Sequence, residues 1–182
     1  YLLNENQLIS RCRVTNPDSK PLPWGFGTHP YFRLPLESNG DATRCTVEAP
    51  LRETWELKDL LPTGRKLPLS MSHTEGLDGK RPFSELKLDD VFTSLQFENG
   101  CCKCRLTDRN TNVAVTYSFD ERFRELVIYT PPNRGAICLE PYTCVTDALN
   151  LQPQGIDAGL GVLQPGESWE GTIVLEAQAF EH

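Results

Sequence analysis

The feature that most constrains this chain is a repeated alternation of apolar and polar residues, interrupted at short intervals by proline and glycine. The clearest run covers residues 113–119, in which every second residue is apolar: Val113, Val115, Tyr117 and Phe119. A period of two is that of a β-strand, because successive side chains of a strand point to opposite faces. The 182 residues include 14 prolines and 13 glycines, and no long stretch has helical spacing. Short strands separated by turn residues predict an all-β protein, an antiparallel β-sandwich.

The same criteria predict strands and connections along the whole chain. We predict strands at residues 8–14, 24–34, 44–51, 53–57, 92–97, 101–107, 113–119, 125–130 and 169–180. Pro62-Thr63-Gly64 is expected to form a turn, residues 67–82 a long loop, and residues 82–88 one short helical turn. Asn99-Gly100 is the strongest hairpin signal. The length is that of one ordinary domain, which we predict to span residues 1–182.

Composition narrows the classes of function. The chain is 38% hydrophobic and 24% charged, as soluble globular proteins are. Its net charge of -7 argues against nucleic acid and anionic membranes as partners, since both attract basic surfaces. No apolar run reaches membrane-spanning length, and no signal-peptide pattern is present. The chain begins with Tyr1 rather than Met, so we expect an N-terminal part to be absent, and the closing Glu181-His182 resembles the start of a purification tag.

The seven cysteines are an odd number without the spacing of a disulfide framework. Cys101, Cys102 and Cys104 resemble a metal-binding knuckle, but no second ligand pair and no nearby histidine follow them. Cys102 and Cys104 instead alternate with Lys103 and Arg105, as the buried side of a strand would. We therefore favour small buried thiols over a metal site, and expect free thiols in a reducing, cytoplasmic compartment.

Glu140 is the candidate catalytic carboxylate. It ends the apolar run 136–139 and is followed by Pro141. Because proline cannot donate to a sheet ladder, it tends to end a strand or to hold it at an edge. Glu140 is therefore expected at the rim of a sheet, next to a loop. A single glutamate at a strand end is more often a solvated acid, so a catalytic role requires a partner.

His29 is the best candidate for that partner. It lies in Gly-Thr-His-Pro-Tyr-Phe, where a strand is expected to meet a loop. An imidazole titrates near neutral pH and can give or take a proton there. The alternative is a histidine that makes one structural hydrogen bond. His73 lies in the predicted polar loop and His182 at the terminus, so neither competes as a partner.

Asp89 is a candidate for ligand binding, with a solvated acid or loop cap as the alternative. Its neighbour Asp90 must point to the opposite face of a strand, so only one of the two can face a given cavity. The aromatics Tyr31, Phe32 and Tyr142 suit a sugar-binding cleft and a sandwich core equally well. A phosphate-cradling glycine loop and a Gly-x-Ser-x-Gly elbow are both missing from the sequence.

Five segments together resemble the aldose 1-epimerase (galactose mutarotase) family, specifically its C-terminal portion. They occur in the family's order at residues 27–32 (Gly-Thr-His-Pro-Tyr-Phe), 61–64 (Leu-Pro-Thr-Gly), 88–92 (Leu-Asp-Asp-Val-Phe), 135–150 (with Leu-Glu-Pro-Tyr and Thr-Asp-Ala-Leu-Asn) and 163–169 (Leu-Gln-Pro-Gly-Glu-Ser-Trp). The resemblance covers nearly the whole chain. Family members begin earlier, with an Asn-Arg motif and a further histidine that this sequence lacks.

The resemblance implies a β-sandwich that interconverts the α and β anomers of a free aldose, such as glucose or galactose, in an open cleft. By that similarity Glu140 matches the general base and His29 the general acid. Asp89, chosen over Asp90 by the position of Phe92, matches a residue that binds sugar hydroxyls. No metal and no other cofactor are implied, and the expected partner is a small sugar.

Two alternatives stay open at this level. A related epimerase for a phosphorylated sugar, such as a hexose 6-phosphate, would need basic residues at the cleft. Arg33, Arg65 and Arg134 are the candidates. A non-catalytic carbohydrate-binding module on the same sandwich is the other alternative. The sequence leaves the choice of sugar and the oligomeric state open.

Overall fold

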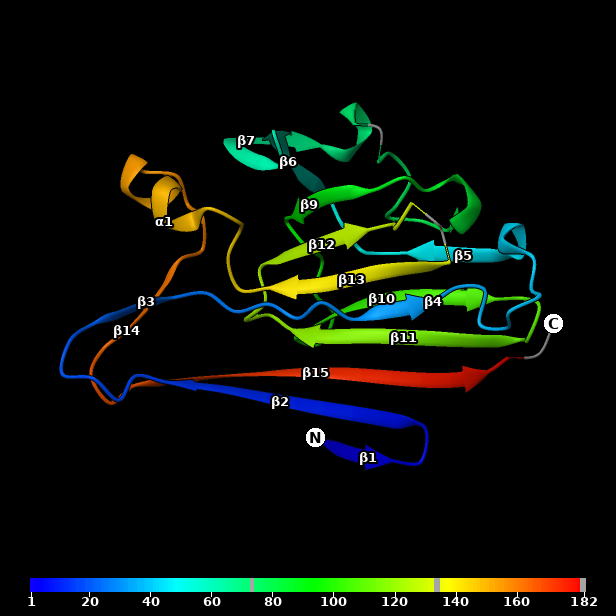
Figure 1. The fold of residues 1–182 in the computed structure, drawn as a ribbon, viewed down its shortest axis with the longest axis horizontal. Helices are drawn as coiled ribbons and strands as arrows, with labels where there is room; N and C mark the ends of the chain where they lie inside the picture. Colours follow the sequence, from blue (N-terminus) through cyan, green and yellow to red (C-terminus); the bar gives the residue numbers. More distant parts are fainter. Residues whose placement is uncertain (73, 133–134, 181–182) are drawn as a thin grey trace.

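The computed structural model describes residues 1–72, 74–132 and 135–180, and its strands form two large antiparallel sheets (Figure 1). The first sheet contains, in spatial order, β1 (Leu2–Asn4), β2 (Gln7–Thr15), β15 (Ser168–Ala179), β11 (Val113–Asp120), β10 (Cys101–Asp108), β5 (Cys45–Glu48) and β8 (Arg81–Pro82). The second contains β4 (Tyr31–Arg33), β13 (Ala136–Tyr142), β12 (Glu125–Tyr129), β9 (Asp89–Thr93), β6 (Glu53–Lys58) and β7 (Leu61–Pro68). The prediction of an all-β antiparallel sandwich is confirmed.

The hydrophobic core lies between the two sheets and follows from the period of two. The seven-stranded sheet contributes residues such as Cys104, Leu106 and Phe119, and the six-stranded sheet contributes Ile128 and Leu139 to the same buried cluster. These side chains lie on one face of each strand, so the alternate residues lie on the outer faces. The outer face of the six-stranded sheet is therefore available to build a site.

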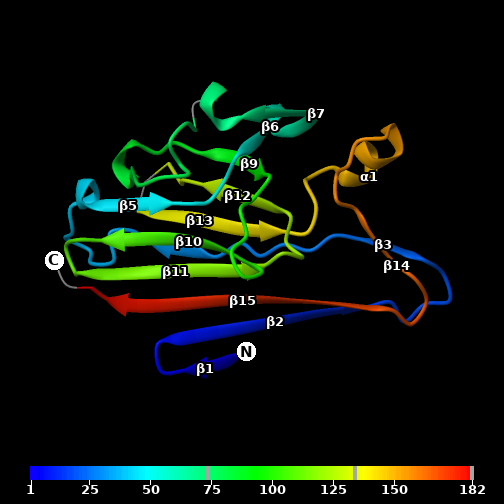
Figure 2. The ribbon, with the colours of Figure 1, turned by 180° about the vertical axis from the view of Figure 1, so that it is seen from behind.

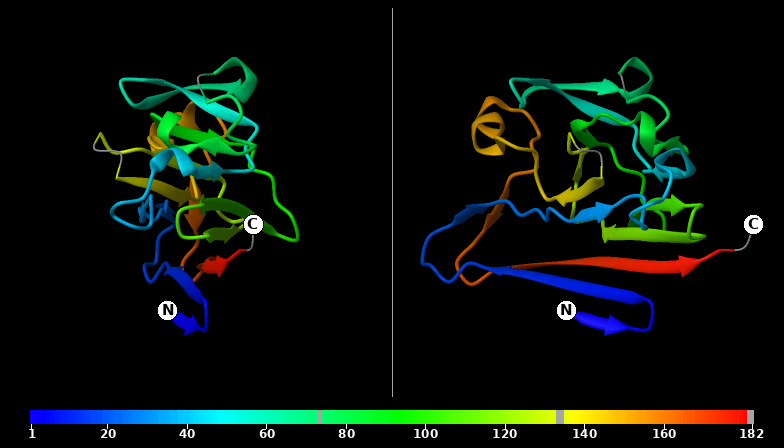
Figure 3. Two further views of the ribbon diagram at one scale, coloured as in Figure 1. Left: turned by 90° about the vertical axis from the view of Figure 1, so that its right-hand side faces the viewer. Right: turned by 45° about the vertical axis from the view of Figure 1, so that its right-hand side comes forward.

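A two-stranded ribbon extends away from the sandwich. It is formed by β3 (Leu22–Trp24) and β14 (Gly161–Leu163), which continue the neighbouring strands β2 and β15 (Figure 1). The same projection is visible from behind and in the turned views (Figures 2 and 3). A short helix, α1 (Ala148–Leu151), lies beside the ribbon in Figure 1. Trp24 and Trp169 pack together with ring centroids 5.0 Å apart, which anchors the base of the ribbon.

Within the described residues, the connections contain four short 3₁₀ helices, at Ala42–Arg44, Leu69–Met71, Phe83–Glu85 and Gln152–Gln154. The third confirms the helical turn predicted in residues 82–88. Asn99 and Gly100 have positive φ of 52° and 77° and form the predicted tight turn, with one bridge between Glu98 and Cys101. The pairing stops there because β9 and β10 belong to different sheets.

Several predicted boundaries are wrong. The single strand predicted at residues 24–34 does not form: β3 ends at Trp24, a loop follows, and β4 begins at Tyr31. The strand predicted at 92–97 begins at Asp89 and ends at Thr93. The loop predicted at 67–82 contains the end of β7, a 3₁₀ turn and the short strand β8. His73, Arg134 and the proposed tag residues Glu181 and His182 lie outside the described residues.

The turn predicted at Pro62-Thr63-Gly64 is also wrong. The chain reverses at Asp59 and Leu60, both with positive φ, and residues 62–64 lie inside β7. Pro62 is tolerated because β7 is an edge strand, where a missing N–H costs no ladder bond. Gly64 has φ +89°, and a Cβ there would lie 2.5 Å from Ile156 Cδ1, so glycine serves strand geometry rather than a turn.

All seven cysteines are unpaired. Cys102 and Cys104 are fully buried in the core, which confirms their interpretation as small buried side chains. Within the described residues, no helix is long and apolar enough to cross a membrane.

Candidate active site

The site lies on the outer face of the six-stranded sheet, where strand register places polar side chains in rows. In β13, Cys138, Glu140 and Tyr142 alternate with core residues and so share this face. Glu140 pairs across the sheet with Val127 of β12, which in turn pairs with Val91 of β9. The adjacent row runs from Cys138 through Tyr129 to Asp89.

A loop between β3 and β4 brings His29 to this face. Gly27 bridges to Tyr142, and the Thr28 amide donates a hydrogen bond to the Pro141 carbonyl at 3.3 Å. The loop lies very close to β13, because a Cβ at Gly27 would lie 2.4 Å from the Tyr142 ring. Only glycine, which has no Cβ, allows so close an approach of the two backbones. Two residues later His29 lies next to Glu140.

The two predicted catalytic side chains are in contact. His29 Nε2 lies 3.2 Å from Glu140 Oε1, and the Tyr142 hydroxyl donates to Glu140 Oε2 at 2.9 Å. The imidazole stacks on the Tyr31 ring, with centroids 5.2 Å apart and planes 8° from parallel. The Glu140 side chain is 2% exposed and that of His29 50% exposed. Among the described residues Glu140 Oε1 has no hydrogen-bonding partner of good geometry.

Burial sets the protonation chemistry of Glu140. Desolvation raises the pKa of Glu140, while the Tyr142 hydrogen bond and the nearby His29 oppose that rise. The charge of Asp89 adds to it. Burial and the adjacent carboxylate raise the pKa of Tyr142 to about 12, so its hydroxyl remains a donor at neutral pH. The result is a carboxylate with raised proton affinity, held by a fixed donor on one oxygen.

The three predicted site residues line one open cavity of about 340 Å³. Its walls are His29, Leu57, Leu60, Asp89, Val91, Val127, Tyr129, Glu140, Tyr142 and Thr146. Asp89 faces this cavity and its neighbour Asp90 is not among the lining residues, as alternation requires. Asp89 lies two strands away from Glu140, on β9, and two residues before Val91, which is in line with Glu140 across the sheet. This places the two Cα atoms about 10 to 12 Å apart.

Comparison with known proteins identifies the family. The model of the aldose 1-epimerase family matches residues 1–176. This chain belongs to the aldose 1-epimerase family.

Solved structures show the same fold. A galactose mutarotase-like protein from Clostridium acetobutylicum superposes with a TM-score of 0.83 at 22% identity, covering 94% of this chain and 52% of that protein. The GalM/aldose epimerase homologue from C. elegans gives 0.76 at 16% identity, with 97% and 57% covered. A galactose mutarotase-like protein from Lactobacillus casei gives 0.73 at 20% identity, with 98% and 61% covered. The chain therefore spans roughly half to three-fifths of the length of these structures.

The strand that carries Glu140 differs from the prediction. β13 does not end at Pro141 but continues to Tyr142, and Glu140 is buried rather than solvated at a rim. β4 pairs only with residues 136–138, so the Pro141 backbone on that side faces the loop before β4. A proline is accommodated there because no regular strand requires its N–H.

Glu125 was missed by the sequence interpretation. It is fully buried on the same face, pairs with Tyr142 across the sheet, and accepts a hydrogen bond from Trp55 Nε1 at 2.9 Å. Desolvation raises the pKa of Glu125 to about 7. The alternation of β12 carried the signal, since Glu125, Val127 and Tyr129 must share one face.

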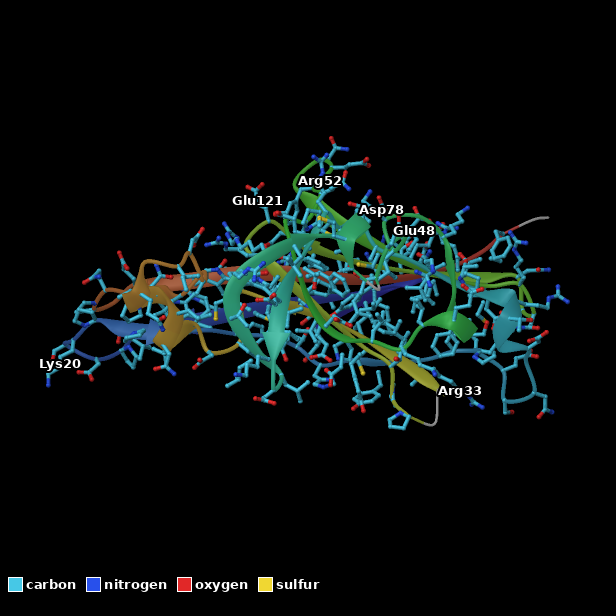
Figure 4. All side chains as sticks on the ribbon, turned by 90° about the horizontal axis from the view of Figure 1, so that it is seen from above. Lys20, Arg33, Glu48, Arg52, Asp78 and Glu121 are labelled. Atoms are coloured by element: carbon cyan, nitrogen blue, oxygen red, sulfur yellow. The ribbon has the colours of Figure 1, made fainter. Side chains whose placement is uncertain are left out.

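Two of the three basic residues suggested for phosphate binding, Arg33 and Arg65, do not line the cavity. Among the described residues, its walls include no lysine and no arginine. Arg65 pairs with Glu56 at 3.3 Å, and Arg33 lies at the periphery of the molecule (Figure 4). Arg134 lies outside the described residues.

Proposed function

We propose that this chain interconverts the α and β anomers of a free aldose, with Glu140 as general base and His29 as general acid. The observation that carries the proposal is the contact between the His29 imidazole and the buried Glu140 carboxylate at one end of a sugar-sized cavity. The family and the fold support the same chemistry.

The proposed reaction opens and closes the sugar ring. Glu140 removes the proton of the anomeric hydroxyl while protonated His29 donates a proton to the ring oxygen. The bond between the anomeric carbon and the ring oxygen breaks, giving the open-chain aldehyde. Rotation about the adjacent carbon–carbon bond exposes the other face, and reclosure reverses both proton transfers. The two oxygens share one carbon, so an acid and a base in direct contact can serve both.

The other cavity residues are proposed to position the sugar. Tyr142 fixes one carboxylate oxygen of Glu140, which leaves Oε1 as the basic atom. Asp89, across the cavity, accepts hydrogen bonds from sugar hydroxyls and so holds the ring in register with the acid–base pair. An unphosphorylated aldose is favoured because the described wall supplies no cation for a phosphate.

Polarimetry of freshly dissolved α-D-glucose and α-D-galactose tests the proposal. The wild-type chain is expected to accelerate mutarotation, and Glu140→Gln to return the rate close to the spontaneous one. Glu170→Gln is the matched control, because Glu170 is an exposed acid on β15 of the other sheet. An unchanged rate in Glu140→Gln would show that the base is elsewhere. Calorimetric sugar binding without rate acceleration would identify a non-catalytic binding module.

A further inference from the structure

Cys138 is a third potential ligand beside the acid–base pair. It lies two residues before Glu140 on the same face of β13 and is fully buried. One ligand atom from each of His29, Cys138 and Glu140 can be chosen such that all three lie within 4.8 Å of one another. The proposed reaction uses His29 and Glu140 and leaves the thiol without a role.

The three donors match the preferences of zinc-like cations. Zn²⁺ binds thiolate sulfur at about 2.3 Å and imidazole nitrogen or carboxylate oxygen at about 2.0 to 2.2 Å, usually as a tetrahedron. Those bond lengths place neighbouring ligand atoms about 3.3 to 3.8 Å apart. The 3.2 Å between His29 Nε2 and Glu140 Oε1 is close to one such edge, and the third donor, from Cys138, lies within 4.8 Å of the other two residues' ligand atoms. Mg²⁺ prefers six oxygen ligands and is a poor match.

A second observation supports a ligand at this position. Glu140 Oε1 is buried and without a hydrogen-bonding partner of good geometry among the described residues, although it points toward the imidazole. Buried polar atoms are normally satisfied, so an unsatisfied one beside a thiol and an imidazole marks a place for a cation or a proton donor. His29 is half exposed, which gives a cation access from the cavity.

We propose that a zinc-class divalent cation binds the triad of His29, Cys138 and Glu140, with its fourth position open to the cavity. On binding, the thiol proton leaves to water and the thiolate, imidazole and carboxylate donate lone pairs to the metal. Both proton-transfer groups are then occupied, so the cation inhibits sugar interconversion. The inhibition rests on the proposed function, whereas the binding does not.

Cobalt absorption spectroscopy on the metal-free chain tests the binding directly. Titration with Co²⁺ is expected to give a thiolate-to-cobalt charge-transfer band that saturates at one equivalent and disappears when Zn²⁺ is added. Cys138→Ser is expected to abolish the band and to weaken Zn²⁺ binding by at least about tenfold. Cys101→Ser is the matched control, because Cys101 lies on β10 of the seven-stranded sheet and is not one of the three proposed ligands. It is expected to leave band and affinity unchanged.

A second variant separates the loss of a ligand from a loss of folding, because Cys138 is buried and Cys138→Ser could unfold the chain. His29→Ala removes a half-exposed ligand, and it is expected to weaken Zn²⁺ by a similar factor while the circular dichroism stays unchanged. A band that persists in Cys138→Ser, or that is lost in Cys101→Ser, would overturn the site. In polarimetry, Zn²⁺ is expected to slow the wild-type chain and not Cys138→Ser. An inactive wild-type chain with intact cobalt binding would refute the proposed function and leave the metal site standing.

Discussion

Two buried glutamates lie on the same face of the six-stranded sheet, and they differ in their surroundings rather than in their burial. Glu140 touches a half-exposed histidine and lines an open cavity. Glu125 is sealed, with the indole of Trp55 as its donor, and does not line that cavity. Each has a raised pKa and one oxygen without a hydrogen-bonding partner among the described residues. A perturbed carboxylate therefore becomes a candidate catalyst only with access and a proton partner.

Replacing each glutamate by glutamine should affect the mutarotation rate very differently. We expect Glu140→Gln to lower the rate enhancement of α-D-galactose mutarotation by about two to four orders of magnitude, since a positioned base contributes that much. Glu125→Gln should keep the rate within about threefold, because the Trp55 indole can still donate to an amide oxygen. Polarimetry at one sugar concentration separates the two. Equal losses would show that burial alone, and not the histidine contact, matters.

His29 supplies the proton partner that Glu125 lacks. His29→Asn should lower kcat about a hundredfold, less than Glu140→Gln, because water can replace a half-exposed acid in part. KM should change little, since the sugar hydroxyls are held elsewhere. A variant that changed only KM would mark His29 as a binding residue instead.

Asp89 and Asp90 lie on opposite faces of β9, so substituting each in turn compares the effect of the two faces on sugar binding. Asp89→Asn should raise KM about tenfold with a smaller effect on kcat, because Asp89 lines the cavity. Asp90→Asn is the matched control and should leave KM near the wild-type value. Steady-state polarimetry over a range of sugar concentrations provides both constants. A reversed order would place Asp90 at the sugar.

Glu125 should affect the free energy of unfolding rather than the mutarotation rate. Its pKa is about 7 when folded, against about 4.3 in an unfolded chain, so ionisation opposes folding. The wild-type chain should lose about 2.5 kcal/mol of unfolding free energy at this group as the pH rises from 5 to 8. Glu125→Gln should lack that loss and be the more stable protein at pH 8. Urea unfolding at both pH values measures the difference, and parallel curves would contradict the assignment.

Local periodicity accounts for how far the sequence could be interpreted. Alternation placed Cys102 and Cys104 in the core and separated Asp89 from Asp90, because face is a property of neighbours in a strand. The burial of Glu140 depends on a loop more than 100 residues earlier in the chain, which no local pattern reveals. The Trp55–Glu125 hydrogen bond joins residues 70 positions apart and was missed for the same reason.

The turn before β7 shows a different limit. Pro62 and Gly64 are typical turn residues, but the chain turns at Asp59 and Leu60 instead. The cause is tertiary: Gly64 is needed where Ile156 approaches the strand, and Pro62 is harmless at the sheet edge. Turn residues predict a local break only when no packing requirement competes for them.

The most direct test of the central claim is the structure of Glu140→Gln with D-galactose bound, because that variant should bind the sugar without interconverting its anomers. We predict the anomeric hydroxyl within hydrogen-bonding distance of Gln at position 140, the ring oxygen beside His29 Nε2, and a distal hydroxyl on Asp89. A galactose bound outside this cavity, or bound with its anomeric carbon directed away from His29, would contradict the account.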